Sequence, residues 1–168
     1  ALDGEAFRIT TGDADVVAIT VDGAEALGFG AAQVSDPGVV LAAPSVPADA
    51  SPDDSLLLTL TITTVGLETF DVALLLPSEE TLDNGDVNDL RDDLAALLAP
   101  ELADNGFAPD AVEVAVEAGR LSLRAGDLGI AALSLAGGEA LGFGTGQTSI
   151  RSIDLTAAAG APTDGRVP

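Results

Sequence analysis

The hexapeptide Glu-Ala-Leu-Gly-Phe-Gly occurs at Glu25–Gly30 and again at Glu139–Gly144 of this 168-residue chain, 114 residues later. Residues 1–33 align with residues 115–147 without a gap, and apolar residues coincide over most of this overlap. Self-similarity at one fixed offset is typical of tandem arrays of folding units. We therefore expect a repeat of about 115 residues, and we expect this sequence to be a window onto a longer array.

The repeat divides the sequence into four predicted parts. Residues 1–35 are the C-terminal part of a preceding repeat, and residues 36–54 form an acidic, Pro-rich linker. Residues 55–147 form a complete repeat module, and residues 148–168 form a linker into the next repeat. The partial repeat lacks the rest of its core. We therefore expect adjoining repeats, or another copy of the chain, to complete it by strand addition.

Apolar periodicity predicts the elements of the complete module. Residues 56–62 and 70–76 alternate apolar and polar residues, which predicts a β-hairpin. Leucines at helical spacing follow, with Asp83 or Asn84 as the N-cap, Pro100 interrupting the pattern and Asp104–Gly106 ending it. Three more strands are expected at Val112–Glu117, Arg120–Ala125 and Ile130–Leu135.

The predicted fold class is α+β and β-rich. The order β-β-α-β-β-β favours a mostly antiparallel sheet of about five strands with one helix packed on it, repeated in tandem. Within the hexapeptide, leucine and phenylalanine are expected to fill the end of the core while the glycines permit tight turns.

The charge balance restricts the partners of the chain. It has 28 Asp and Glu against six Lys and Arg, for a formal net charge of −22. Nucleic acid is excluded as a partner, because phosphate binding needs cationic side chains. No apolar run is long enough for membrane insertion. Cations are needed to offset carboxylate repulsion, and oxygen ligands without any Cys or His favour Ca²⁺. A saline habitat would explain the same bias.

Three groups of acidic and amide side chains are candidate Ca²⁺ ligands. The segment Asp83–Asp89 places several oxygens around a glycine, as in the first part of a calcium loop. A capped helix start with solvated acids explains that segment equally well. Ions held at module junctions by linker and turn acids would remove hinge freedom. The candidate ligands are Asp83, Asn84, Asp86, Asn88, Asp89, Asp49, Asp53, Asp54, Asp13, Asp15 and Asp127.

The composition argues against catalysis. There is no His or Cys to serve as base or thiol nucleophile, and the glycine-rich stretch at residues 142–147 lacks the Lys and helix of a phosphate loop. Paired carboxylates are too abundant to be informative. We expect no enzymatic activity, no catalytic residues and no cofactor other than Ca²⁺.

The module resembles the long repeats of giant bacterial surface adhesins and, more distantly, the IN motif of flagellin and hook-associated proteins. The similarity rests on "TLDNGDVNDLRDDLAALLAPELADNGF", "VEVAVEAGRLSLRAGD" and the "EALGFG" close. The chain lacks the glycine-rich nonapeptides that bind calcium in repeats-in-toxin proteins. The resemblance implies an extracellular location at a bacterial cell surface, a fibrous or distance-spanning role, frequent use of calcium, and repeats without catalytic residues.

Two functions follow as hypotheses. The first is a structural repeat module of an extracellular bacterial adhesin or surface nanofibre, assembling end to end into a filament and rigidified by calcium at module junctions. The alternative is a ligand- or carbohydrate-binding module presented in a multivalent array. The absence of Trp and Tyr argues against stacking on sugars.

Overall fold

The computed structural model describes residues 8–11, 16, 19–24, 27, 29, 33–34 and 36–156. The chain divides into two units, which we treat separately. The large unit is Val39–Ile150, and the terminal unit is Ala1–Gly38 together with Arg151–Pro168.

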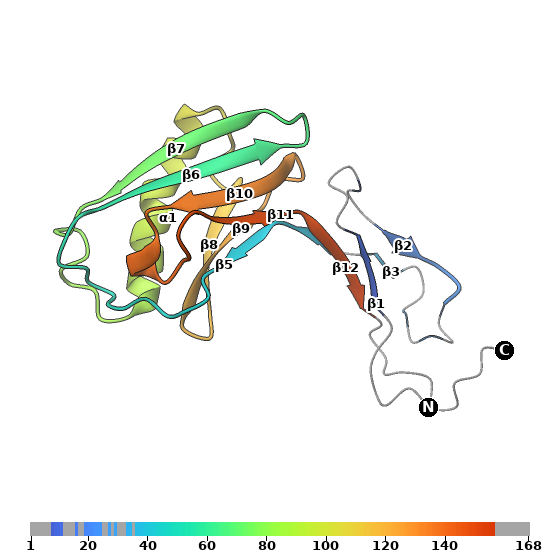
Figure 1. Cartoon of the computed structure of the whole chain (residues 1–168), viewed down its shortest axis with the longest axis horizontal. Helices are drawn as coiled ribbons and strands as arrows, with labels where there is room; N and C mark the ends of the chain where they lie inside the picture. The colour runs from blue at the N-terminus through green and yellow to red at the C-terminus, as the bar shows by residue number, and fades with distance from the viewer. Residues whose placement is uncertain are drawn as a thin grey trace. The chain divides into compact units, whose positions relative to one another are not determined.

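Within the described residues, the large unit contains two antiparallel sheets and one α-helix (Figure 1). One sheet has the strand order β11-β10-β6-β7, and the other has the order β5-β9-β8. A 3-10 turn at Glu139–Leu141 lies between β10 and β11. The bounds are β5 Val40–Ala42, β6 Leu56–Thr64, β7 Thr69–Leu76, α1 Val87–Asp104, β8 Val112–Glu117, β9 Arg120–Ala125, β10 Ile130–Ala136 and β11 Gln147–Ile150.

The order of β6, β7, α1, β8, β9 and β10 confirms the predicted α+β, β-rich fold with its β-β-α-β-β-β sequence of elements. The alternation of apolar and polar residues explains why these segments form strands, because every second side chain of a strand lies on the same face. On β6, Leu58, Leu60 and Ile62 are buried while the intervening threonines are only partly covered. The turn between β8 and β9 uses Ala118 and Gly119 at φ of 51° and 77°, as a tight hairpin requires.

The helix α1 ends at Asp104, the start of the segment that the sequence predicts to end it. It continues through Pro100, which is expected to interrupt the pattern, and Leu102 in its last turn is fully buried. Proline removes one backbone donor inside a helix, but here burial of the following turn outweighs that cost. The N-cap is Asp86 rather than the predicted Asp83 or Asn84.

The core of the large unit lies between the two sheets and α1. The helix packs against β7, β8 and β9, and its buried face consists of leucines four residues apart, which lie on one side of a helix. Only a void of about 20 Å³ remains where the leucines of α1 meet both sheets. The buried helix residues are Leu90, Leu94, Leu98 and Leu102.

The structure differs from the prediction in the number of sheets and in the two segments predicted as linkers. The strands form two sheets instead of one sheet of about five, because α1 connects β7 in one sheet to β8 in the other. The segment 36–54 is not only a linker. It contains β5, which pairs with β9, and Val39, Leu41 and Ala43 are buried in the core.

The segment 148–168, predicted as a linker, also contains strands. Its first residues belong to β11, which pairs with β10 in the large unit. The strand β12, Ser152–Thr156, belongs to the terminal unit. The remaining residues of this segment, 157–168, lie outside the described residues.

The terminal unit contains five short strands among its described residues: β1 Arg8–Thr11, β2 Thr20–Val21, β3 Gln33–Val34, β4 Asp36–Gly38 and β12. One sheet has the order β1-β12-β4, and β2 pairs with β3. A small apolar cluster surrounds Phe29, which is 5% exposed, and contains Ile19, Val21, Ala24 and Leu27.

Candidate functional site

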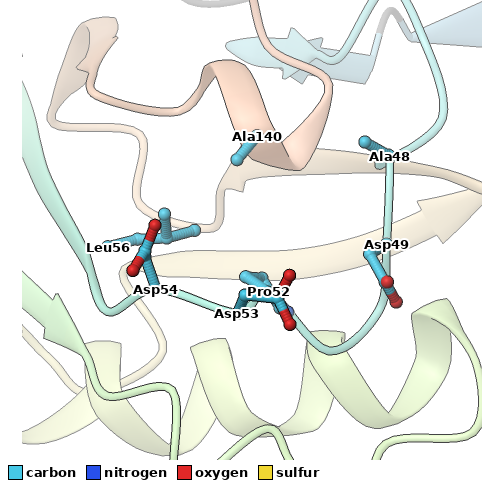
Figure 2. A pocket seen from close by; sticks show the side chains of 7 residues that line it. All are labelled: Ala48, Asp49, Pro52, Asp53, Asp54, Leu56 and Ala140. Atoms are coloured by element: carbon cyan, nitrogen blue, oxygen red, sulfur yellow. The ribbon is translucent and has the colours of Figure 1, made fainter.

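The acidic loop, residues 48–56, borders a hollow of about 220 Å³ on the large unit (Figure 2). Three of the predicted calcium ligands, Asp49, Asp53 and Asp54, line it. Figure 2 shows their carboxylates spread along the loop rather than directed at one point. Asp49 Oδ1 accepts a hydrogen bond of 3.0 Å from the backbone N–H of Ser51, which fixes a turn in the loop.

Most of the predicted ligands in the segment 83–89 lie at the N-terminal end of the helix α1. Asp86 accepts from the backbone N–H of Asn88 at 2.7 Å, and Asp89 Oδ2 accepts from the N–H groups of Gly85 and Asp86 at 2.8 and 3.3 Å. This reciprocal arrangement is a capping box. The hydrogen bond from the Asn88 backbone is the main cause that lowers the pKa of Asp86. Asp83 and Asn88 are exposed.

Asn84 joins the helix start to the acidic loop. Its Nδ2 donates to the carbonyl oxygen of Ala50 at 3.1 Å and to Oδ2 of Asp93 at 2.9 Å. Two of the three sequence-predicted groups of acids therefore lie side by side, since Ala50 follows Asp49 directly. An amide is needed here because a carboxylate could not donate to these two oxygens.

The last group of predicted ligands is dispersed. Asp127 Oδ1 accepts from the backbone N–H of Gly129 at 2.7 Å and lines a separate hollow with Asp110 and Glu113. Asp13 and Asp15 lie outside the described residues. Within the part of the chain that the structure describes, no group of three or more Asp or Glu side chains is placed to hold a metal ion. Calcium binding stays a prediction.

The second copy of the hexapeptide holds the segment that precedes the acidic loop. The backbone N–H and Oγ of Ser45 donate to the carbonyl oxygen of Gly142 at 3.3 and 3.2 Å, and the N–H of Ala48 donates to Ala140 at 3.4 Å. Gly142 has φ of 87°, and a Cβ atom there would collide with the Ser45 carbonyl. Leu141 and Phe143 are buried, as the sequence predicts.

Gln147 is a structural residue whose role sequence reasoning missed. Its Nε2 donates to the carbonyl oxygen of Ala42 on β5 at 2.7 Å, and its Oε1 accepts from the N–H of Gly144 at 2.8 Å. It thereby ties the hexapeptide turn to β5. The signal was present in the sequence, because Gln33 occupies the equivalent position 114 residues earlier.

The described residues of the first hexapeptide, Leu27 and Phe29, repeat two hydrogen bonds of the second. The N–H groups of Leu27 and Phe29 donate to the carbonyl of Ala24 at 2.9 and 3.4 Å. The equivalent groups of Leu141 and Phe143 donate to Gly138 at 3.0 and 3.1 Å. These two hydrogen bonds therefore occur at both positions.

The strand ladders of the two units also share their registers. In the terminal unit, Ile9 on β1 lies opposite Leu155 on β12. In the large unit, Leu123 on β9 lies opposite Leu41 on β5, which are the equivalent positions after a shift of 114. A second strand pair shows the same equivalence. The strands β2 and β3 pair Thr20 with Val34, and β10 and β11 pair Ser134 with Thr148.

Comparison with known proteins provides no family assignment. No family model matches the chain, and no curated protein matches it. Among the described residues, there is no helix with the length and apolar character needed to cross a membrane. The function is therefore argued from the chain itself.

Proposed function

We propose that the chain is a structural repeat module of an extracellular bacterial adhesin or surface nanofibre, which joins neighbouring repeats or copies end to end. The observation that carries this proposal is the shared register. Two strand pairs and one turn recur with the same partners at an offset of 114 residues. Such a recurrence is expected of units that stack in one direction, each contacting only its neighbours.

The link between consecutive units supports the same role. The chain passes from β4 in the terminal unit directly into β5 in the large unit, with Val39 between them. On the other side it passes from β11 to β12 through Arg151 alone. Neither connection contains a long flexible linker.

The charge distribution fits a role outside the cell with cations bound or condensed on the surface. The net charge of −22 is large for a chain of this size, and the mutual repulsion favours extended assemblies unless cations reduce it. The acidic loop lies between β5 and β6 within the large unit. We propose Ca²⁺ as the cation that stiffens this region.

Electron microscopy of a polypeptide with several consecutive periods tests the proposal. We expect a straight rod with a regular axial repeat whose length grows in proportion to the number of periods. Residues 39–150 alone are the matched control, and they should give particles of one size. Beads joined at variable angles, or particles whose length does not follow the number of periods, would contradict the proposal.

A further inference from the structure

The strand β12 lies between two strands from the other end of the chain. In the terminal unit it pairs with β1 through Arg8↔Thr156 to Thr11↔Ile153, and with β4 through Asp36↔Asp154 to Gly38↔Ser152. Within the described residues, β1 and β4 pair with β12 and with no other strand. The N-terminal part of the chain thus forms a slot that accepts one strand along both of its edges.

The occupant of this slot has the same pattern as β5. In the large unit, Val39 and Leu41 are 1% and 0% exposed, and Leu41 pairs with Leu123. The sequence places Ile153 and Leu155 at the equivalent positions, 114 residues later. A strand of this alternating pattern suits a β9-like partner, because pairing at this register aligns the apolar positions of the two sequences.

The donor strand and the acceptor slot are at opposite ends of the sequence. The slot consists of Arg8–Thr11 and Asp36–Gly38, and the donor follows the last strand of the large unit by one residue. Each copy therefore carries one slot and one donor. A contact between unlike surfaces of identical copies is heterologous, and when it does not close into a ring it propagates as a filament.

We propose that Ser152–Thr156 of one copy inserts between β1 and β4 of a second copy, in the register seen within one chain. This inference deepens the proposed end-to-end assembly and rests on it. The exchange keeps every backbone hydrogen bond of the closed chain. Its free-energy cost is mainly the loss of the advantage that a strand has when it pairs within its own chain. That advantage corresponds to an effective concentration in the roughly millimolar range for short connections, so exchange increases with protein concentration.

Cysteine cross-linking of the full chain tests the exchange directly, because the sequence contains no cysteine. Thr10 and Asp154 are Cα partners in β1 and β12. Partners in an antiparallel ladder have Cα atoms about 4.5 to 5.5 Å apart, within the range of a disulfide. The single variants Thr10→Cys and Asp154→Cys are unfolded, mixed, refolded together over a series of concentrations and oxidised. Non-reducing electrophoresis and peptide mass spectrometry then identify the linked residues.

We expect a disulfide between position 10 of one copy and position 154 of another, with a yield that rises with concentration. The matched control uses the equivalent pair in the large unit, Val40→Cys and Arg124→Cys. Both of its strands lie in one continuous unit, so the mixed single variants should remain monomeric. The double variant V40C/R124C should close within one chain at every concentration.

The outcomes separate this inference from the proposed function. If T10C/D154C closes within one chain but the mixed single variants never link, exchange between copies does not occur and the inference is overturned. If the control pair links between chains as efficiently, the exchange is unspecific and the inference is again overturned. Rods formed by polypeptides with several covalent periods would still support the proposed function in either case.

Discussion

The large unit and the terminal unit contain equivalent segments that differ in how far they are buried. Leu123 on β9 is 7% exposed, whereas Ile9, its equivalent on β1, is 37% exposed. Phe143 and Phe29, the equivalent aromatic residues of the two hexapeptides, are both 5% exposed. The turn therefore buries its phenylalanine in either setting, while the β1/β9 strand needs further elements to cover its apolar face.

The difference in burial comes from elements that cover the apolar face of β9 in the large unit. In the large unit, Leu123 contributes to the core beside Leu94 and Leu98 of α1 and Leu58 and Leu74 of the β6–β7 hairpin. The described strand β1 aligns with β9, and the segments of the large unit that cover Leu123 align with no residue of the given sequence. The comparison teaches that the shared strand pairs and the hexapeptide turn are encoded locally. The stability of the large unit also depends on α1 and the β6–β7 hairpin, which precede β9 in the chain.

The largest expected difference between the units comes from the strand that pairs with β9 or β1. Leu41→Ala should lower the free energy of unfolding by about 2 to 5 kcal/mol, because it leaves a cavity in the core. Leu155→Ala, the equivalent change, should cost less, since its partner Ile9 remains partly exposed. Urea unfolding measures both, with Val40→Ala, 40% exposed, as the control. Equal costs at positions 41 and 155 would break the comparison.

The glycines of the second hexapeptide provide the next test. Gly142→Ala should be strongly destabilising, because alanine in the left-handed region costs roughly 1 to 2 kcal/mol and its Cβ would also collide with the Ser45 carbonyl. Gly146→Ala is the control, with φ of 57° and open space around the added atom. It should show only the backbone cost. Similar losses of urea midpoint for the two variants would mean that the contact with Ser45 is not tight.

Calcium should act on the large unit through the acidic loop. For a site with the roughly 0.1 to 1 mM affinity of extracellular modules, about 10 mM Ca²⁺ would add about 1.4 to 2.7 kcal/mol to the free energy of unfolding. Thermal unfolding with Ca²⁺ and with chelator, at constant ionic strength, measures this gain. The triple variant D49N/D53N/D54N should lose it.

A charge-matched variant makes the calcium experiment specific. Glu68, Asp104 and Glu113 are exposed and do not border the hollow of the acidic loop. E68Q/D104N/E113Q changes the net charge by the same amount and should keep the gain. If both triple variants respond to Ca²⁺ alike, the ion acts by diffuse screening and the loop is not a site.

The smallest effect concerns the helix cap of the large unit. The pKa of Asp86 lies below its ordinary value of 3.8, because the backbone N–H of Asn88 stabilises the charged form. A lowered pKa in the folded state gives stability that is present above the unfolded pKa and is lost as pH falls through the folded pKa. Asp86→Asn keeps the cap but should remove this part of the acid sensitivity. Urea midpoints at neutral and acidic pH compare the two proteins, and parallel curves would contradict the assignment.

Much of the large unit could be predicted from sequence because its strands obey simple alternation. The bounds of β8 and β9 agree with the prediction. The strand β5 was missed because it is short and lies in a Pro- and Asp-rich segment, and only its pairing with β9 makes it a strand. The end of α1 at Asp104 agrees with the prediction, but the regular helix through Pro100 depends on burial of Leu102, which local propensity does not include.

The candidate site was less predictable than the fold. Composition identifies carboxylates but not their directions, and many of the predicted ligands accept hydrogen bonds from nearby backbone N–H groups. Asp49, Asp86 and Asp127 all do so. The link from Asn84 to Ala50 spans 34 residues of sequence, so no local pattern could indicate it.

The position of Asn84 has a chemical consequence for an ageing protein. Glycine follows this asparagine, and that pairing is the sequence context in which asparagine side chains most readily hydrolyse to aspartate. The product would place a carboxylate against the Ala50 carbonyl and the Asp93 carboxylate, where the amide now donates to both. Attraction would become repulsion, because an ionised carboxylate has no proton to donate. A single spontaneous reaction would thus release the acidic loop from α1.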